Sequence, residues 1–540
     1  MAKDNDTVDV LAIGAGASGA AFSWSLAEAG IEVMCLDQGG WLDPADYPST
    51  HDDWEVHRQT DFNSNPNVRG LPQDYPLNND GTPIAPLMYN AVGGSTIHWS
   101  AHFPRLHPSD FRVKSLDGVA DDWLLTYGDL EPFFDLNDRM VGVAGLSGDT
   151  AYPPKPPRQT RPIPLGKVGE TIVGGFDKLG WHWWPSDSAI LTEAYDGRLP
   201  CNNCGPCDIG CTRRARASAD VTYWPKALAK GVKLKPHCRV REITVGSDGL
   251  ADGAIYYDSE GTVHKQGARV VVLGCNGVGT PRLLLNSTSN LFPDGLANGS
   301  GLVGKNLMFH PEAVVSGFFE QAIDGHVGPT GCSVLSQEFY ETDLSRGFVR
   351  GYGFQVVRGT GPASTSLGGL GAQRVPWGQK HHSAMAQRLG HSLAVGIMGE
   401  DLPEAHNRVT LDPNLMDSDG IPAPKIEYTM SENSLKMMAH GVERASELLE
   451  AAGAKTLAAN PLLEPSGWHL MGTARMGTDG SNSVVDGWGR AHDVKNLFII
   501  DGSIWVTGGA VNPTSTIQAL ALRTADYVKG EARHLLDGGV

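Results

Sequence analysis

The sequence contains no long hydrophobic run and no excess of basic residues. No uninterrupted stretch of about 18 apolar residues occurs, so we expect no membrane-spanning helix. The segment from Met1 to Thr7 is polar and lacks the basic and apolar regions of a signal peptide. Lys and Arg number 43 against 61 Asp and Glu, a net charge of −18, so nucleic acids and anionic membrane surfaces are not expected partners.

Charged residues and cysteines are also scarce. Charged residues make up 19% of the chain, and eight cysteines in 540 residues are too few for a disulfide scaffold. Glycine is abundant, with 67 residues, and shows no collagen-like period. The length exceeds that of one simple core and predicts two or three packed domains in a turn-rich enzyme.

The N-terminal part of the chain reads as a strand, a glycine turn, a helix and a second strand. An apolar run at residues 8–13 ends in the turn at 14–19, a helical stretch follows at 20–29, and a second apolar run occupies 31–37. This order predicts a βαβ unit of the type that binds dinucleotides.

The turn has the spacing G-x-G-x-x-G. Gly14 permits the tight turn, Gly16 lets the backbone approach a pyrophosphate, and Gly19 permits close packing of helix and strand. The helix N-terminus adds partial positive charge, and Asp37, about 20 residues further on, is placed to accept hydrogen bonds from a ribose. The motif predicts dinucleotide binding but does not separate FAD from NAD.

Longer motifs separate the two cofactors. They occur in a fixed order and touch nearly the whole chain: GAGASG (14–19), VGGSTIHW (92–99), ARVVVLGCNGVGTPRLLLNS (268–287), GLVGKNLMFHP (301–311), GWHLMGTARMG (467–477) and NLFIIDGSIWVTGGAVNPTSTIQALALRTADYV (496–528). Together they resemble the glucose-methanol-choline (GMC) family of FAD-dependent alcohol oxidoreductases, and most of all its sugar and gluconate dehydrogenase and pyranose oxidase-like branch. The resemblance implies FAD as the cofactor.

The resemblance also implies which residues hold FAD. Asp501 matches the position beside the FAD pyrophosphate, and Val240 matches the residue whose backbone meets the adenine. Gly93 and Gly94 match the glycines that pass close to the flavin. His98 stands where sugar-oxidising relatives attach the flavin covalently, and covalent and non-covalent binding both stay open here.

Two further residues are implied as catalytic. His469 corresponds to the active-site histidine, and Asn512 to the second active-site position. A histidine suits the removal of a hydroxyl proton, and an amide steadies the developing alkoxide, while flavin N5 accepts the hydride. Pro513 and Thr514 begin a predicted helix whose N-terminus would stabilise negative charge on the reduced flavin.

Four of the eight cysteines lie close together in one loop, with the spacing C-x2-C-x2-C-x3-C. They are Cys201, Cys204, Cys207 and Cys211. The spacing suits an iron–sulfur cluster and is too tight for a usual two-knuckle zinc site. The resemblance extends to family members with a [3Fe–4S] cluster in this region, but their first two cysteines are adjacent, whereas here Asn202 follows Cys201. A cluster, a structural thiol or disulfide loop, and zinc remain as alternatives.

Other segments predict parts of the second domain. Residues 316–400 alternate apolar and polar positions and predict antiparallel strands. The Pro-rich segment 152–164 cannot be regular helix or central strand. Residues 365–382 predict a long mobile loop, and 431–452, which includes Leu435, an amphipathic helix.

The sequence therefore predicts an α/β fold. A Rossmann-like FAD-binding domain is built from discontinuous segments, and a substrate domain has an antiparallel sheet covered by helices. The expected FAD-binding segments are 1–110, 222–315 and 490–540. The expected substrate or cap domain comprises 111–221 and 316–489, with the cysteine loop at 200–212.

The expected reaction is the oxidation of a CH–OH group on a sugar or glycoside, by a dehydrogenase rather than an oxidase. Electrons would pass to an external protein or quinone, and a small subunit is a further expected partner. Two alternatives stay open: an enzyme that oxidises a lipid or aromatic alcohol with O2, and a non-catalytic flavin subunit that relays electrons. The expected location is the cytoplasm, or the periplasm if a signal-bearing partner exports the chain.

Overall fold

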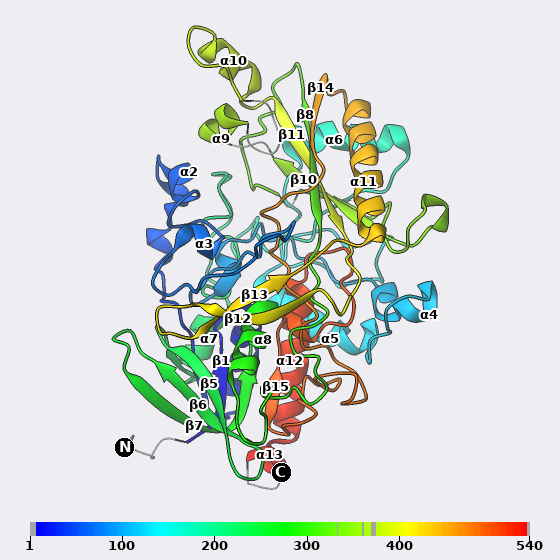
Figure 1. Ribbon diagram of the computed structural model, residues 1–540. Helices are drawn as coiled ribbons and strands as arrows, with labels where there is room; N and C mark the ends of the chain where they lie inside the picture. Colours follow the sequence, from blue (N-terminus) through cyan, green and yellow to red (C-terminus); the bar gives the residue numbers. More distant parts are fainter. Residues whose placement is uncertain (1–6, 332, 359–360, 369–373, 537–540) are drawn as a thin grey trace.

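The computed structural model describes residues 7–331, 333–358, 361–368 and 374–536. A parallel sheet lies at one end of the molecule and an antiparallel sheet at the other (Figure 1). The parallel strands, in the order β4-β2-β1-β7-β15, are β4 (Lys233–Lys235), β2 (Val33–Leu36), β1 (Val8–Ile13), β7 (Val263–Leu273) and β15 (Leu497–Ile499). Their apolar runs are typical of strands that are buried on both faces.

Helices cover both faces of this sheet. On one face, Phe22 and Leu26 of α1 (Ala17–Glu28) share a core with Ala525 of α12 (Thr514–Gly530). On the other face, Leu284 of α8 (Asn276–Asn286) packs in a second core. The doubly wound α/β architecture predicted from the sequence is therefore confirmed.

Strand β7 pairs in parallel along one half and antiparallel along the other, within one sheet. Its second half, from Ala268, pairs in parallel with β1, whereas residues 263–267 pair antiparallel with β6 (Ala251–Tyr257). Strand β6 in turn pairs with β5 (Arg239–Val245), so a three-stranded antiparallel meander extends the parallel sheet.

The second sheet is antiparallel throughout, as predicted for residues 316–400. In the order β14-β8-β11-β10-β9-β3, its strands are β14 (Thr456–Asn460), β8 (Glu312–Phe318), β11 (Ser392–Gly399), β10 (Tyr352–Arg358), β9 (Val334–Ser336) and β3 (Trp184–Pro185). Helices α6 (Gly166–Leu179) and α11 (Glu432–Ala451) cover one face with a core that includes Ile172, Leu448 and Ile397.

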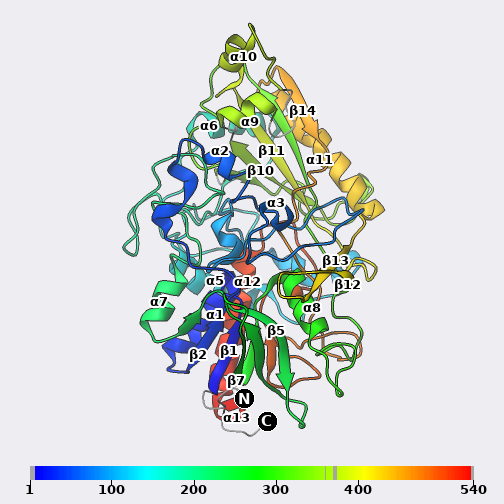
Figure 2. The same cartoon turned by 60° about the vertical axis from the view of Figure 1, so that its left-hand side comes forward.

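The other face of the antiparallel sheet looks toward the nucleotide-binding half. Because side chains alternate along a strand, Val315 and Val395 join the core under α11, whereas Val314 and Met398 line a cavity. Short helices α2 (Trp54–His57) and α3 (Pro66–Arg69) lie on the side of the sheet away from α11 (Figure 2).

The remaining elements connect the two halves. The other α-helices are α4 (Val113–Asp117), α5 (Tyr127–Val141), α7 (Tyr223–Ala229), α9 (Pro362–Leu367), α10 (His381–Arg388) and α13 (Ala532–Leu536), and β12 (Arg408–Met416) pairs with β13 (Pro422–Glu427). The 3₁₀ turns are η1 (Pro44–Asp46), η2 (Pro48–Thr50), η3 (Gly94–Ile97), η4 (Pro108–Arg112), η5 (Leu344–Arg346) and η7 (Gly502–Ile504). No described helix has both the length and the apolar character needed to cross a membrane.

The predictions for individual segments are confirmed in some places and wrong in others. The predicted helix at 431–452 is α11, but Leu435 is 55% exposed and lies outside its buried stripe. Segment 152–164 contains neither helix nor strand, as its prolines require. The loop predicted at 365–382 is partly wrong, because α9 and α10 enter it at its two ends, while residues 369–373 lie outside the described part. The predicted domain limits remain a prediction.

Candidate active site

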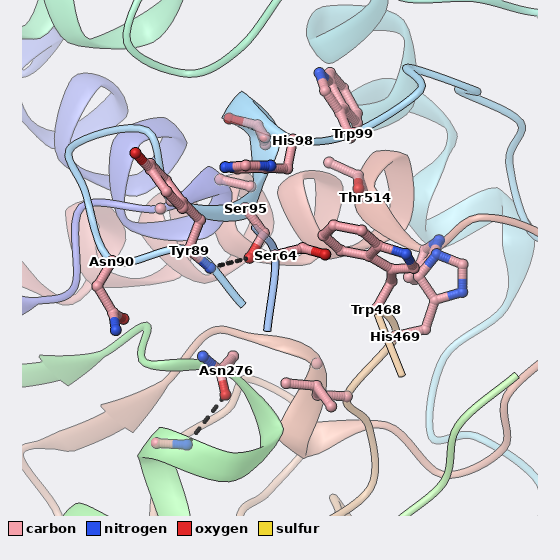
Figure 3. Close-up of a pocket in the computed structure, with 18 of the residues that line it drawn as sticks. Ser64, Tyr89, Asn90, Ser95, His98, Trp99, Asn276, Trp468, His469 and Thr514 are labelled. Atoms are coloured by element: carbon pink, nitrogen blue, oxygen red, sulfur yellow. Dashed lines mark hydrogen bonds between the residues drawn. The ribbon is translucent and has the colours of Figure 1, made fainter. Parts of the chain in front are cut away.

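One cavity of about 780 Å³ runs between the two sheets. The glycine turn lines it through Gly14 and Gly16, and His469 and Asn512 line the same cavity. Figure 3 shows His98 and Tyr89 on one side of this space, with Trp468 and His469 across from them. The fold therefore brings the predicted nucleotide-binding and catalytic residues, far apart in sequence, to one place.

The three glycines of the turn have different surroundings. Gly14 has φ +99°, and a Cβ there would lie 2.4 Å from the carbonyl oxygen of Gly274. A Cβ on Gly19 would lie 2.0 Å from the carbonyl oxygen of Gly14, so helix and turn pack too closely for any side chain. A Cβ on Gly16 would meet no described atom within 4 Å, and Gly16 lines the cavity. Its backbone thus faces free space at the start of α1.

The N-terminus of α1 is open to an anion. Within the described chain no side chain caps it, and its first turn contains no acidic residue, so the positive end of the helix dipole is not neutralised. Asp37 lines the cavity nearby and accepts hydrogen bonds from the N–H groups of Ala15 and Gly39, at 2.7 and 2.8 Å. Burial outweighs these two bonds and raises the pKa of Asp37 to about 6. Its ribose contact remains a prediction.

The second glycine segment closes on the first. The N–H of Gly93 donates to the carbonyl oxygen of Ala15 at 2.9 Å, and a Cβ on Gly94 would lie 2.9 Å from the Cα of Gly16. Gly94 lines the cavity, whereas Gly93 is not among the residues that line it. This contact places η3, and with it His98, at the side of the cavity.

His98 is buried and neutral. Its ring lies 4.2 Å from that of Tyr89 between centroids, and its Nε2 has no hydrogen-bond partner among the described residues. Burial, and then the charges of Arg69 and Arg216, hold the pKa of His98 well below its usual value. A neutral imidazole with a free nitrogen at the cavity wall is the form that can react with, or hydrogen-bond to, a bound group.

Asp501 and Val240 complete the nucleotide-binding side. Both line the cavity, Val240 from β5. One oxygen of Asp501 accepts from the N–H of Asn276 at 3.0 Å and from the hydroxyl of Thr280 at 2.6 Å. The other accepts from Ser503, at 2.9 Å from its N–H. Asp501 thus fastens the start of α8 to the segment after β15.

His469 forms a hydrogen bond with a second histidine. The Nδ1 atoms of His469 and His310 are 2.8 Å apart, and Nε2 of His310 lies 3.3 Å from the carbonyl oxygen of Gly508. A carbonyl only accepts, so Nε2 of His310 carries the proton and its Nδ1 accepts from Nδ1–H of His469. This assigns the lone pair of His469 to Nε2, for which the described chain provides no hydrogen-bond partner.

Burial keeps this histidine pair uncharged. It lowers the pKa of His310 to about 4. It also holds the pKa of His469 well below its usual value, with smaller contributions from His310 and His102. His469 therefore stays neutral in mildly acidic solution, as a base must.

Asn512 is oriented by a residue of the antiparallel sheet. The Nε2 of Gln355, on β10, donates to Oδ1 of Asn512 at 2.8 Å. The amide N–H groups of Asn512 are then available to the cavity, which Asn512 lines together with Pro513 and Thr514. Helix α12 begins at Thr514, and within the described chain no side chain caps it. The amide and the open helix N-terminus both offer donors to a negative group.

Glu312 is an unexpected acidic residue in the cavity. It begins β8, opposite Met398 in the register, and no described residue hydrogen-bonds to its carboxyl group. Burial alone raises its pKa to about 8, so the carboxyl is protonated at neutral pH. In that state it can both donate and accept a hydrogen bond.

The sequence analysis missed four of these residues. His310 lies in the motif GLVGKNLMFHP, and Trp468 precedes His469 in another motif, so both carried a signal. Gln355 and Glu312 stand on strands whose cavity-facing side the sequence does not reveal.

The cavity fits the FAD that the resemblance predicts. The space at Gly16 and the uncapped start of α1 suit a pyrophosphate. Asp37 and Val240 line the part of the same cavity that would hold the nucleoside. His98 also lines this cavity, and its Nε2 has no hydrogen-bond partner among the described residues. The residues that would hold FAD thus line the same cavity as His469.

The four loop cysteines lie beside this cavity. Their loop contacts η3, because the N–H of Gly210 donates to the carbonyl oxygen of Ile97 at 3.1 Å and Asp208 lines the main cavity. All four are free thiols, and burial raises the pKa of Cys207 to about 12. The cysteines line a second cavity of about 20 Å³, little more than one water needs.

The positions of these thiols do not form a zinc site. No three of the sulfur atoms, all within the described residues, lie within 4.8 Å of one another, whereas a zinc tetrahedron brings them to about 3.8 Å. The donor set suits iron and sulfur, but the closed cavity holds a cluster only if the loop opens.

A cavity that joins a nucleotide-binding turn to a buried, neutral histidine and an amide is typical of a flavin-dependent alcohol oxidoreductase. Family models described as GMC oxidoreductase match residues 170–312 and 403–521. The chain is 42% identical to a 2-methyl-1,2-propanediol dehydrogenase of Mycolicibacterium austroafricanum, over 99% of this chain and 98% of the relative. It is 30% identical to the fructose dehydrogenase large subunit of Gluconobacter japonicus, over 99% and 100%.

The chain belongs to the GMC oxidoreductase family, whose enzymes act on alcohol groups. A solved structure of formate oxidase from Aspergillus oryzae superposes with a TM-score of 0.70 at 16% identity and covers 99% of this chain and 100% of its own. At that identity the likeness concerns the fold, and it agrees with the α/β architecture described above.

Proposed function

We propose that this protein is an FAD-dependent dehydrogenase that oxidises a CH–OH group of a sugar, a glycoside or a related small polyol. The observation that carries the proposal is the His310–His469 pair, which presents a neutral imidazole Nε2 to the same cavity that the nucleotide turn lines. Relatives named for fructose, for paromamine and for a diol support an alcohol that carries further polar groups.

His469 and Asn512 have different roles toward the substrate hydroxyl. Nε2 of His469 accepts the hydroxyl proton, and the proton on Nδ1 stays in the hydrogen bond to His310. The amide of Asn512, fixed by Gln355, donates to the same oxygen and stabilises its developing negative charge. FAD, when bound, supplies the acceptor for the hydride that leaves the carbinol carbon.

The wall formed by the antiparallel sheet, which adjoins Asn512, favours a polar substrate. Glu312, Gln355 and Asn460 all line the cavity from the antiparallel sheet. Asn460 and Gln355 flank Val314 and Gly396 in one row across four strands. Carboxyl and amide groups in one wall can hydrogen-bond to the hydroxyls of a polyol, and burying them against a plain lipid chain would leave them unpaired.

For the electron acceptor we infer an external protein or quinone. The support is the position of the cysteine loop, which touches η3 beside His98 and reaches the surface at the exposed residue Cys204. An iron–sulfur cluster held by its four thiols, when bound, would carry single electrons to a partner. We propose in addition that His98 holds the flavin, either by a covalent bond or by contact.

One preparation tests these points together. Purified protein is kept anaerobic, mixed with fructose, glucose, gluconate or 1,2-diols, and followed by flavin absorbance. Bleaching by a polyol, slow reoxidation by O2 and fast reoxidation by a quinone are expected. No bleaching by any polyol, or fast use of O2, would contradict the proposal. Iron and sulfide analysis, and acid precipitation to see whether flavin stays with the protein, decide the cluster and the link to His98.

A further inference from the structure

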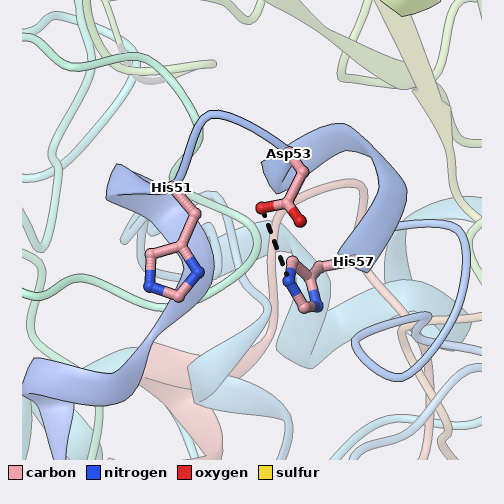
Figure 4. A group of neighbouring side chains, drawn as sticks. All are labelled: His51, Asp53 and His57. Atoms are coloured by element: carbon pink, nitrogen blue, oxygen red, sulfur yellow. Dashed lines mark ion pairs between the residues drawn. The ribbon is translucent and has the colours of Figure 1, made fainter.

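Three side chains that can bind a metal lie close together in residues 51–57, next to the cavity-lining residues Arg58 and Gln59. His51, Asp53 and His57 each offer one ligand atom, and these atoms lie within 4.8 Å of one another (Figure 4). The Nε2 of His57 is 3.6 Å from Oδ1 of Asp53, and the two imidazole centroids are 5.8 Å apart. None of the three is among the residues that line the cavity, so this cluster is separate from the active site.

Local backbone structure brings the three residues together. His51 follows η2 directly, and its carbonyl oxygen accepts from the N–H of Trp54 in a turn, at 3.3 Å. Asp53 precedes α2, and the N–H of His57 donates to its carbonyl oxygen at 3.3 Å. Residues four apart in a helical turn lie on the same side, so Asp53 and His57 face one another. The turn adds His51 to the same side.

A fourth residue orients the second histidine for a metal. Oδ1 of Asp61 lies 2.9 Å from Nδ1 of His57 and accepts from the hydroxyl of Thr60 at 3.0 Å. A carboxylate only accepts, so Nδ1 carries a proton. In the neutral ring that binds a metal, the lone pair of His57 is then on Nε2, toward Asp53. A carboxylate behind the remote nitrogen is the usual arrangement for a histidine that binds a metal.

The electrostatic surroundings favour a cation. Asp52, Asp53 and Asp61 place three carboxyl groups within a short stretch of chain. The neighbouring cation, Arg58, is committed to Asp208 of the cysteine loop at 2.6 Å. Both His51 and Asp53 are exposed, and so an ion from solution can reach them.

We propose that His51, Asp53 and His57 bind one divalent transition-metal ion of the zinc class, with water completing its coordination. Two imidazoles and one carboxylate suit Zn²⁺, whereas Ca²⁺ and Mg²⁺ prefer oxygen ligands alone. Ligands about 2.1 Å from zinc lie closer together than 4.8 Å, and rotation of exposed side chains supplies that movement.

The bound ion would have a structural effect. It would fasten η2 to α2, and the residues after His57, Arg58 and Gln59, line the cavity. The same segment is tied to a distant loop, because the carboxylate of Glu55 accepts from the N–H groups of Ala363 and Ser364, each at 2.8 Å. The metal would thus hold one wall of the cavity in place without taking part in the chemistry.

Zinc titration of the flavin-loaded protein tests the proposal. Chelator-treated protein is titrated with Zn²⁺ by calorimetry, and bound equivalents are counted. Free thiols elsewhere in the chain can also take up added zinc. The test therefore compares the number of equivalents bound: His51→Gln and His57→Gln are each expected to bind one equivalent fewer than wild type. Asp61→Asn should keep that equivalent but weaken it about 10–100-fold.

A matched control separates this site from scattered surface binding. His406 is another exposed histidine beside a carboxylate, Glu404, at 3.4 Å. His406→Gln is expected to bind as many equivalents as wild type. Equal stoichiometry and affinity in wild type, His51→Gln and His57→Gln would overturn the proposal. Flavin content, measured in each variant, shows that the compared proteins are folded.

Discussion

Replacement of His310 by alanine tests the assignment of the proton on His469. The hydrogen bond between the two Nδ1 atoms, 2.8 Å long, would disappear, and Nδ1–H of His469 would be left buried without an acceptor. A lost hydrogen bond contributes about 1 kcal/mol and an unsatisfied buried donor costs about 1–3 kcal/mol. If about 2.7 kcal/mol of this cost is added to the activation free energy of the reaction, kcat falls about 100-fold.

The pH dependence gives a second readout. Protonated His469 cannot accept the hydroxyl proton, so kcat/KM falls as the pH drops through its pKa. In wild type that acid limb lies well below pH 6.5, because burial and His310 lower the pKa of His469. In His310→Ala, water entering the vacated space reduces the desolvation, and the acid limb should move up toward 6.5. His310→Gln, which can accept from His469 and donate to Gly508, should recover most of kcat.

The assay is the rate of anaerobic flavin reduction by a saturating alcohol at several pH values. Phe309→Leu is the control, since Phe309 is adjacent and buried but packs on Tyr428, with ring centroids 4.7 Å apart. It should lower stability and leave the rate unchanged. A His310→Ala variant with kcat within twofold of wild type and an unmoved acid limb would refute the role of His310.

Three more predictions each concern one feature of the cavity: the Gln355–Asn512 hydrogen bond, the buried Glu312 and the glycine turn. Gln355→Leu should lower kcat about 10-fold with little change in KM, because Asn512 loses its orienting donor, and equal steady-state kcat in variant and wild type would contradict this. Between pH 4.5 and 8 the folded wild type keeps Glu312 protonated, whereas the unfolded chain ionises it. The free energy of unfolding of Glu312→Gln should therefore rise relative to wild type by about 1.4 kcal/mol per pH unit in this range. Urea titrations that show a pH-independent difference between the two proteins would contradict this prediction. Gly16→Ala should fold like wild type but lose flavin, whereas Gly19→Ala should fail to fold, and circular dichroism with flavin content separates the two outcomes.

The nucleotide-binding half was predictable from sequence because its signals are local. The turn from Gly14 to Gly19 needs glycine for reasons that spacing alone reveals, and close packing on Gly14 and Gly274 excludes a side chain at two of the three positions. The start of α12 after Pro513 was equally readable. Such features depend on residues near one another in the chain, so their geometry follows from the sequence pattern.

The substrate side was harder to predict because it depends on strand register. Whether Glu312 and Gln355 face the cavity or the core under α11 is decided by which face of the sheet the helices cover, and alternation alone leaves both choices open. The partner of His469 comes from a segment 159 residues away. The cysteine spacing suggested a cluster but did not predict the closed cavity that the thiols line.

The central claim is that His469 is the base in alcohol oxidation by a bound flavin. The most direct measurement compares wild type and His469→Ala, both loaded with FAD, for anaerobic bleaching of the flavin by a polyol. The account predicts complete bleaching in wild type and a rate about 10²–10⁴-fold lower in the variant, with flavin content unchanged. Bleaching at the wild-type rate in His469→Ala, or a wild-type flavin that no alcohol reduces, would contradict it.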